Sequence, residues 1–265
     1  MAIDPAARIA PDVELGPDVE VGPGAIIEGP SRIGRGTRIL AHAYIGPHTT
    51  MGENNLVAFG AIIGYEPQDY AFKGRESYTI IGDHNLIREY VTIHRGTKPG
   101  SATRVGSHNF LMALSHLAHN AVVGDRVIVV NGALVGGYVE LADQAYISGH
   151  CVIHQFCRVG RLALMRGGSR TSRDVPPFSI IDGDHTVRGL NLVGLKRAGF
   201  TAQQISALQQ AFRLIFWRRG NLSLALERVA AEVPQTPEVI HLLEFIRAST
   251  RGIALGPKHA HGDEL

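Results

Sequence analysis

The sequence predicts an all-β solenoid followed by an α-helical segment, and two patterns lead to this fold class. Apolar side chains recur at every sixth residue from Ile3 to Ile63, at positions 81, 87 and 93, and again from Val105 to Met165. Positions two residues earlier are mostly small or short. Neither a helix nor an alternating strand has a period of six, whereas a solenoid with three flat faces per turn does. Each hexapeptide is therefore expected to form one short strand and one corner, so that eighteen residues complete a coil.

The solenoid domain is expected over residues 1–177, in roughly nine coils. Two interruptions preserve the six-residue phase, and both are predicted to be loops, over residues 65–79 and 98–104. Loops that leave a rigid scaffold commonly form binding sites. The thirty-one glycines of the chain suit frequent corners, where the absence of a Cβ is an advantage.

A helical domain is expected over residues 178–253, because the period changes after Pro177. Thr201 and Gln204 form a capping-box pattern that opens a helix running until Gly220. A second helix is predicted from Leu222 to Val233. A third begins at Thr236, with a proline at its first position, and stops near residue 252. These helices are expected to cap the solenoid, and the polar tail 254–265 is expected to be disordered.

Composition excludes several classes of protein. A formal net charge of +2 does not by itself suggest nucleic-acid binding. The first eight residues do not resemble a secretory signal, and no window approaches a membrane-spanning helix, which favours a cytoplasmic protein. Cys151 and Cys157 lie in the small-residue phase that faces inward, so we expect core thiols rather than a disulfide.

Coil arithmetic places three chemically useful residues in one column. His119, Gly137 and Gln155 are eighteen residues apart, so they should stack at one corner, about 5 Å per step. The column offers a base, a backbone N–H free of side-chain obstruction and an orienting amide, which are the groups that an acyl-transfer site needs. The alternative is that these residues are simply solvated or lie between subunits.

Two further features have functional and structural explanations side by side. His94, His116 and His119 are candidates for a zinc site shared across a subunit boundary, although no carboxylate or cysteine cluster accompanies them. Residues 156–200 contain eight Lys and Arg against three Asp, which suits either an acidic or phosphate-bearing partner or an ordinary solvated face.

Several motifs resemble those of the UDP-N-acetylglucosamine acyltransferase family, which catalyses the first step of lipid A biosynthesis. The motifs, which follow one order along residues 1–253, are Ile93-His-Arg-Gly-Thr97, His116-x-x-His119, His154-Gln-Phe156, Asp174-Val-Pro-Pro177, Gly194-Leu-Lys-Arg197 and Ser249-Thr-Arg-Gly252. The resemblance implies a left-handed parallel β-helix of hexapeptide repeats with a C-terminal α-helical domain, an exception to the usual right-handed crossover. It also implies a homotrimer with active sites between subunits.

The resemblance further implies roles for individual residues. His119 matches the general base that takes a proton from the sugar 3-hydroxyl, and the Gly137 N–H matches the oxyanion donor. The acyl group would arrive on the phosphopantetheine of acyl carrier protein, with no other cofactor and no metal. Substrate-binding residues are expected at Asp69, Lys73, His116, Tyr138, His154, Gln155, Gly167, His185, Asn191 and Arg197.

Departures from the family pattern leave the acceptor open. Ala71 and Ala198 replace basic residues, Tyr138 replaces a histidine, Asn120 replaces an aspartate, and Arg166 is unexpected beside Gly167. Losing one phosphate-facing cation costs roughly 1.5–3 kcal/mol. Three functional hypotheses follow. The protein is an acyltransferase acting on UDP-N-acetylglucosamine or its 3-amino analogue, a relative that acylates another sugar, or a non-catalytic or zinc-binding solenoid.

Overall fold

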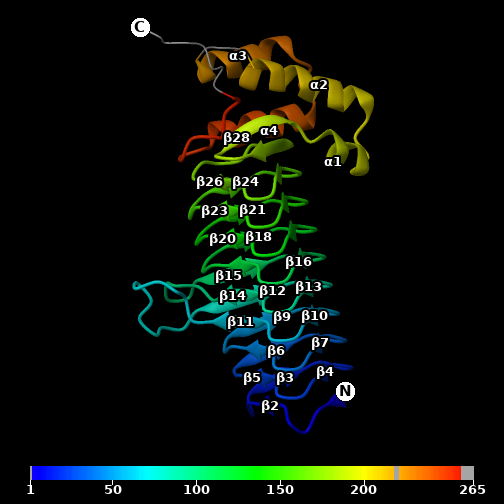
Figure 1. Cartoon of the computed structure of the whole chain (residues 1–265), viewed down its shortest axis with the longest axis vertical. Coiled ribbons are helices and arrows are strands. Elements are labelled where there is room, and N and C mark those ends of the chain that lie inside the picture. The colour runs from blue at the N-terminus through cyan, green and yellow to red at the C-terminus, as the bar shows by residue number, and fades with distance from the viewer. Residues whose placement is uncertain (1, 218–220, 258–265) are drawn as a thin grey trace.

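The computed structural model describes residues 2–217 and 221–257, and it has the shape of a three-sided rod with helices at its C-terminal end (Figure 1). In the described residues, the rod consists of three sheets of short strands, and consecutive strands of the chain go to different sheets except for β27 and β28. All strand pairs are parallel except β27 with β28. The predicted β-helix of hexapeptide repeats followed by helices is thus confirmed.

The strands of each sheet follow in spatial order. The first sheet contains β1 (Ala2–Ile3), β4 (Glu20–Val21), β7 (Arg38–Ile39), β10 (Leu56–Val57), β13 (Leu86–Ile87), β16 (Phe110–Leu111), β19 (Ile128–Val129), β22 (Tyr146–Ile147), β25 (Leu164–Met165), β27 (Ser179–Asp182) and β28 (Thr186–Leu190). The second contains β2 (Arg8–Ile9), β5 (Ile26–Ile27), β8 (Tyr44–Ile45), β11 (Ile62–Tyr65), β14 (Thr92–His94), β17 (His116–Leu117), β20 (Leu134–Val135), β23 (Val152–Ile153) and β26 (Arg170–Thr171). The third contains β3 (Val13–Leu15), β6 (Ser31–Ile33), β9 (Thr49–Met51), β12 (Tyr78–Ile81), β15 (Ala102–Val105), β18 (Val122–Val123), β21 (Glu140–Leu141) and β24 (Arg158–Val159).

The interior of the rod contains the residues of the six-residue phase. Ile39, Ile93 and Met165 are each fully buried, and the two free cysteines lie in the same core, as expected. Ile3 is 43% exposed because no coil lies below the first one. The small-residue phase also holds a ladder of buried asparagines, in which the side-chain oxygen of Asn55 accepts a hydrogen bond from the next rung, Asn85 N–H. Such bonds satisfy polar groups inside an otherwise apolar core.

Most corners depend on residues other than glycine. Among the described residues, seventeen non-glycine residues have positive φ, against eleven glycines. Six of the seventeen are histidines, which accounts for much of the histidine content of the chain: His42, His48, His84, His108, His150 and His185. The expectation that glycine serves the corners therefore holds for fewer than half of these positions.

The first loop is shorter than the sequence pattern suggests, whereas the second, which follows β14 at His94, begins and ends earlier than predicted. The first runs from the end of β11 at Tyr65 to the start of β12 at Tyr78, because Tyr78 and Thr79 already pair with β15. The second ends before Ala102, where β15 begins to pair with β12. The first loop projects from the rod in Figure 1.

The C-terminal region begins with a hairpin that the hexapeptide pattern does not predict. β27 continues the first sheet past residue 177 by pairing with β25, and β28 returns antiparallel to it. An Asp182-Gly183 dipeptide, a common hairpin signal, lies at this turn. The division into domains at 177 stays a prediction.

Within the described residues, four α-helices and one π-helical turn follow, namely α1 (Leu192–Arg197), α2 (Ala202–Phe212), η1 (Arg213–Trp217), α3 (Leu222–Glu232) and α4 (Pro237–Arg247). The capping box at Thr201 is present, and Pro237 opens α4, as expected. The predicted end at Gly220 lies outside the described residues. None of the helices in the described part of the chain is both long and apolar enough to cross a membrane.

The last helix ends five residues earlier than its predicted stop near 252, since α4 ends at Arg247. The chain then returns to the end of the rod. Ala254 is fully buried and its N–H donates to the Asp174 carbonyl, at 2.8 Å. The disorder expected from residue 254 is therefore wrong for Ala254 to Pro257, because backbone groups at the end of the rod provide partners, and 258–265 lie outside the described residues.

Candidate active site

The predicted column forms at one corner of the rod. The pairing of β17 with β20 and of β20 with β23 sets His116 beside Leu134 and Leu134 beside Val152, so the corner residues three positions later are also in register. Those residues are His119, Gly137 and Gln155. Each is followed by a residue with positive φ, which turns the chain toward the third sheet. The backbone ladder continues through the corner, where Tyr138 N–H donates to the His119 carbonyl at 3.0 Å.

The His119 imidazole is buried, and a side-chain oxygen lies near each ring nitrogen. Nδ1 lies 3.2 Å from Asn120 Oδ1, and Nε2 lies 3.5 Å from Asp69 Oδ2 in the first loop. The same Asn120 oxygen accepts a hydrogen bond from Thr97 N–H at 2.9 Å. Because an N–H can only donate, the bond from Thr97 identifies this Asn120 atom as the amide oxygen, which accepts hydrogen bonds. His119 Nδ1 therefore carries the proton and donates a hydrogen bond to Asn120 Oδ1. Nε2 is then an unprotonated base that faces a carboxylate.

Gly137 leaves room for this imidazole. A methyl group on Gly137 would lie 2.6 Å from Cε1 and 2.7 Å from Nε2 of His119, which is too close for any side chain. The φ of Gly137 is not positive, so the backbone itself does not require glycine there. Within the described residues, its N–H donates to no protein acceptor. A base and a free backbone donor are thus neighbours.

Two stacked rings enclose the base on one side. Tyr138 packs edge-on against His119, with ring centroids 5.4 Å apart, and stacks on Phe156 at 4.9 Å. Lys98 Nζ lies 5.9 Å from the centroid of the Tyr138 ring. Phe156 was not predicted as a site residue, although it follows Tyr138 by one coil. The aromatic pair therefore forms one wall beside His119.

Two further histidines lie beside the base in a buried group. The rings of His94 and His116 are 4.9 Å apart, and His116 Nδ1 lies 2.7 Å from Thr92 Oγ1. Burial is the larger cause, and repulsion from the neighbouring histidines the smaller one, that together lower the pKa of His94 to about 4. Burial also lowers the pKa of His116. Both rings are therefore neutral at pH 7. Across the described ranges, no group of three or more His, Cys, Asp or Glu is arranged to hold a metal ion, so the zinc alternative has no support within one protomer.

An exposed apolar strip on the second sheet extends from this column. Leu134 and Val152 lie one above the other beyond His116, and these residues are 46% and 45% exposed. At the opposite corner of that sheet lies Gly167, one coil above Gly149. The nearest atom to a methyl group on Gly167 would be the Gly149 carbonyl oxygen at 3.6 Å, so packing does not explain this glycine. The strip can accept an extended hydrocarbon chain.

The first loop provides Asp69 and also Lys73, which line one hollow of about 610 Å³ together with Gln68 and Phe72. Arg95, which directly follows β14, holds this loop in place. Its guanidinium donates to the Gly64 carbonyl at 3.2 Å and to Glu66 at 3.3 Å, and it lies over the Phe72 ring. Arg95 belongs to a motif noted in the sequence, but only the structure assigns it a contact.

The other predicted site residues lie apart from the base within one protomer. His154 and Gln155 are exposed two coils beyond His119, and His185 occupies the turn between β27 and β28. Asn191 is buried as the N-cap of α1, where its side chain accepts from Gly194 N–H and donates to the Leu162 carbonyl. Arg197 is exposed in the last turn of α1, and this helix lies beside the C-terminal end of the rod (Figure 1).

Comparisons with known proteins agree with the fold. Residues 102–137 match the bacterial transferase hexapeptide family, described as six repeats. The parallel sheets of hexapeptide strands thus define a hexapeptide-repeat transferase. Residues 174–254 match the second domain of Udp N-acetylglucosamine O-acyltransferase.

Curated relatives extend the match along the chain. The acyl-[acyl-carrier-protein]–UDP-N-acetylglucosamine O-acyltransferase of Synechocystis is 44% identical over 226 residues, which cover 85% of this chain and 75% of the relative. The protein of the same name from Stutzerimonas stutzeri is 38% identical over 265 residues, covering 95% and 96%. The chain therefore belongs to the acyl-[acyl-carrier-protein]–UDP-N-acetylglucosamine O-acyltransferase family.

Solved structures are similar over nearly the whole length. LpxA from Bacteroides fragilis superposes with a TM-score of 0.90 at 42% identity, covering 94% of this chain and 98% of the other. LpxA from Acinetobacter baumannii gives a TM-score of 0.92 at 35% identity, covering 96% and 100%. The similarity includes both the rod and the C-terminal helices.

Proposed function

We propose that this protein transfers a 3-hydroxyacyl chain from acyl carrier protein to the 3-hydroxyl of UDP-N-acetylglucosamine, the first step of lipid A biosynthesis. The observation that carries the proposal is the adjacency of His119 Nε2 and Gly137, a base beside a backbone donor without a protein partner. Family membership supplies the substrates, since the relatives bear this activity in their names.

His119 acts as the general base. Its Nε2 takes the proton of the sugar hydroxyl, whose oxygen attacks the thioester carbonyl carbon. The negative charge that develops on the carbonyl oxygen accepts a hydrogen bond from Gly137 N–H. The intermediate then collapses, the C–S bond breaks, and the departing thiolate of the carrier takes the proton back from Nε2. Asn120 holds Nδ1–H throughout, and the Asp69 carboxylate, 3.5 Å away, stabilises the transient imidazolium.

The acyl chain occupies the strip of Leu134 and Val152, which begins beside the base and leads toward Gly167. Apolar surface of this kind gains roughly 25 cal/mol per Å² when a hydrocarbon covers it. A single protomer leaves the strip open to water. We therefore place the chain between two protomers of a homotrimer, where the neighbour closes the groove.

The acyl carrier protein is acidic and docks on the basic region near the helices. Asp174, Asp182 and Asp184 already pair with Arg158, Arg166 and Arg170. Among the described residues, the cations of this region that form no ion pair are Arg161, Arg173, Lys196 and Arg197. These four supply the local positive field that attracts the carrier and its phosphopantetheine.

The acceptor is tested by mass spectrometry. Purified protein is incubated with 3-hydroxyacyl carrier proteins of several chain lengths, and with UDP-N-acetylglucosamine or its 3-amino analogue. We expect an ester product with UDP-N-acetylglucosamine and a preferred chain length. Amide product from the amino sugar alone would support the alternative acceptor, which the replacement of basic residues by Ala71 and Ala198 favours. No product with either acceptor would overturn the proposed function.

A further inference from the structure

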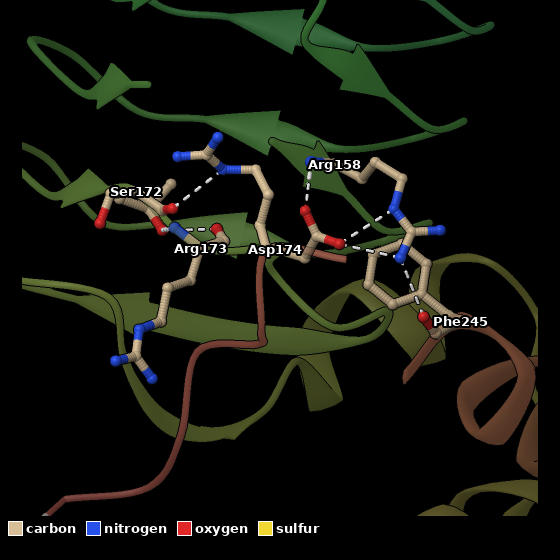
Figure 2. Close-up of polar contacts among 7 residues, drawn as sticks. Arg158, Ser172, Arg173, Asp174 and Phe245 are labelled. Atoms are coloured by element: carbon tan, nitrogen blue, oxygen red, sulfur yellow. Dashed lines mark hydrogen bonds and ion pairs between the residues drawn. The ribbon is translucent and has the colours of Figure 1, made fainter. Parts of the chain in front are cut away.

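The segment after α4 is fixed against the last coil by two sets of contacts. The Asp174 carboxylate accepts hydrogen bonds from the Arg158 backbone and guanidinium, at 2.8 Å to 3.0 Å (Figure 2). Arg158 also donates to the Phe245 carbonyl of α4 at 3.0 Å and lies over its ring. In the backbone, Asp174 N–H donates to the Gly252 carbonyl at 2.9 Å, and Ala254 N–H donates to the Asp174 carbonyl at 2.8 Å. The position of the intervening Arg251 is therefore set by neighbours on both sides.

The Arg251 side chain reaches from this segment to the predicted site. Its Nε–H donates to the Ser172 carbonyl at 3.2 Å, and its Nη2 lies 3.3 Å from His154 Nδ1. This contact joins residues 97 positions apart in the chain. His154 immediately precedes Gln155 of the catalytic column. A residue from the end of the chain thus contacts the edge of the site.

Two groups compete for His154 Nδ1. The Gln155 carbonyl oxygen lies 3.1 Å from it and can only accept a hydrogen bond. The Arg251 guanidinium can only donate, because it keeps its proton under all ordinary conditions. One nitrogen of a neutral ring cannot both accept from Arg251 and donate to Gln155. The charged donor determines the outcome, because charge-assisted hydrogen bonds are the stronger kind.

We propose that Arg251 is a positioning residue that fixes the tautomer of His154, with Nδ1 unprotonated and Nε2–H available as a donor. Without Arg251, Nδ1–H donates to the Gln155 carbonyl, and Nε2 becomes an acceptor instead. The tautomer assignment stands on the contacts alone. Its consequence, that His154 donates to an oxygen of the nucleotide sugar, rests on the proposed function.

The substitution Arg251→Gln tests this without releasing the segment, because the backbone bonds of Gly252 and Ala254 to Asp174 remain. Arg251→Lys keeps a cationic donor. A matched control is Arg247→Gln, which removes one charge from an exposed residue of the same region. Thermal unfolding of each variant verifies that the fold is retained.

The decisive measurement is ¹⁵N NMR of histidine-labelled full-length protein, with His154→Gln used to assign the signal. We expect an unprotonated Nδ1 for His154 in wild type, in Arg247→Gln and in Arg251→Lys, and a protonated Nδ1 in Arg251→Gln. A protonated Nδ1 in wild type, or no change in Arg251→Gln, overturns the proposal.

Steady-state kinetics then separate the tautomer from its use. Arg251→Gln should raise the KM for the nucleotide sugar about tenfold, the loss of roughly one hydrogen bond, with little change in kcat. Arg251→Lys should recover most of this loss. A changed tautomer with unchanged KM confirms the assignment and overturns the role of His154 in acceptor binding.

Discussion

At the residue scale, the proposed chemistry depends on how one corner presents a histidine. His119 is oriented by Asn120, and Asn120 is oriented by Thr97 N–H from the second loop. The amide provides the tautomer control that a carboxylate at this position would provide, but without its negative charge. The charge next to the base comes instead from Asp69 in the first loop. With asparagine at position 120, Nδ1 of His119 thus has an acceptor, and the Asp69 carboxylate lies near Nε2.

Gly137 provides a sharp test at this scale. We expect Gly137→Ala to lower kcat by about 10²-fold or more, because the new methyl group displaces the imidazole, while the thermal unfolding midpoint hardly changes. The adjacent Gly136→Ala should instead destabilise the fold, since its methyl group would lie 2.7 Å from the Gln155 backbone nitrogen. Gly189→Ala, which meets no atom within 4 Å, is the neutral control. A fully active Gly137→Ala would contradict the proposed geometry.

Sequence reasoning could find this column because eighteen-residue spacing fixes which residues stack. It could not find the hydrogen bond from Thr97 to Asn120, because the conformation of a loop does not follow from the repeat. Phe156 was within reach, since the spacing that aligns Gly137 with Gln155 also aligns Tyr138 with Phe156. Arg251 was not, because its contact depends on how the helical region meets the rod.

At the scale of elements, the period of six was sufficient to predict the strands, since each inward position is buried by the coils above and below. The hairpin β27–β28 departs from that period, and η1 continues α2 with a different hydrogen-bond pattern. Local sequence gives little indication of a π-helical turn, and its three buried side chains show that packing determines it. Elements whose form depends on tertiary contacts were therefore the ones missed.

Arg95 is expected to control the first loop. Arg95→Ala should speed trypsin cleavage at Lys73 and Arg75 several-fold and raise the KM for the nucleotide sugar, because the loop that carries Asp69 loses its guanidinium contacts. The side chain of Arg95 is only 10% exposed, so its removal also leaves the Gly64 carbonyl without this donor, which costs roughly 1–3 kcal/mol of stability. Arg88→Ala, which breaks an exposed ion pair with Glu89, should change neither the cleavage rate nor the KM for the nucleotide sugar. Equal cleavage rates for Arg95→Ala and wild type would show that Arg95 does not hold the first loop in place.

At the scale of the whole molecule, the proposed homotrimer shares each site between two protomers, with the base from one and α1 from its neighbour. Light scattering should give about three times the 28.6 kDa mass of one chain. Trimers that carry only His119→Ala, or only Arg197→Ala, should each have low activity. When they are co-assembled, about a quarter of the sites combine both intact residues, and activity should return accordingly. Mixed trimers without recovered activity would place both residues in the same protomer.

Stability should fall as the pH is lowered through the histidine range. The pKa of buried His94 is about 4, against an ordinary value of 6.5, so between these values the unfolded chain binds one more proton than the folded one. The stabilisation is fully present above pH 6.5, and about 3 kcal/mol is lost toward pH 4. Urea unfolding at pH 7.5 and pH 5 should show a smaller difference for His94→Gln than for wild type. Exposed His150→Asn is the control, and an unchanged difference for His94→Gln would rule out this origin.

The central claim is that the His119–Gly137 corner performs acyl transfer, and single-turnover kinetics test it most directly. Wild type and His119→Ala, in separate reactions, are each supplied in excess over 3-hydroxyacyl carrier protein, with UDP-N-acetylglucosamine present. The acylated sugar is followed by mass spectrometry. The account predicts rapid product formation by wild type and a rate 10²- to 10⁴-fold lower for the variant, about the contribution of a general base, with unchanged binding of the carrier. A folded His119→Ala variant that forms product at the wild-type rate would contradict it.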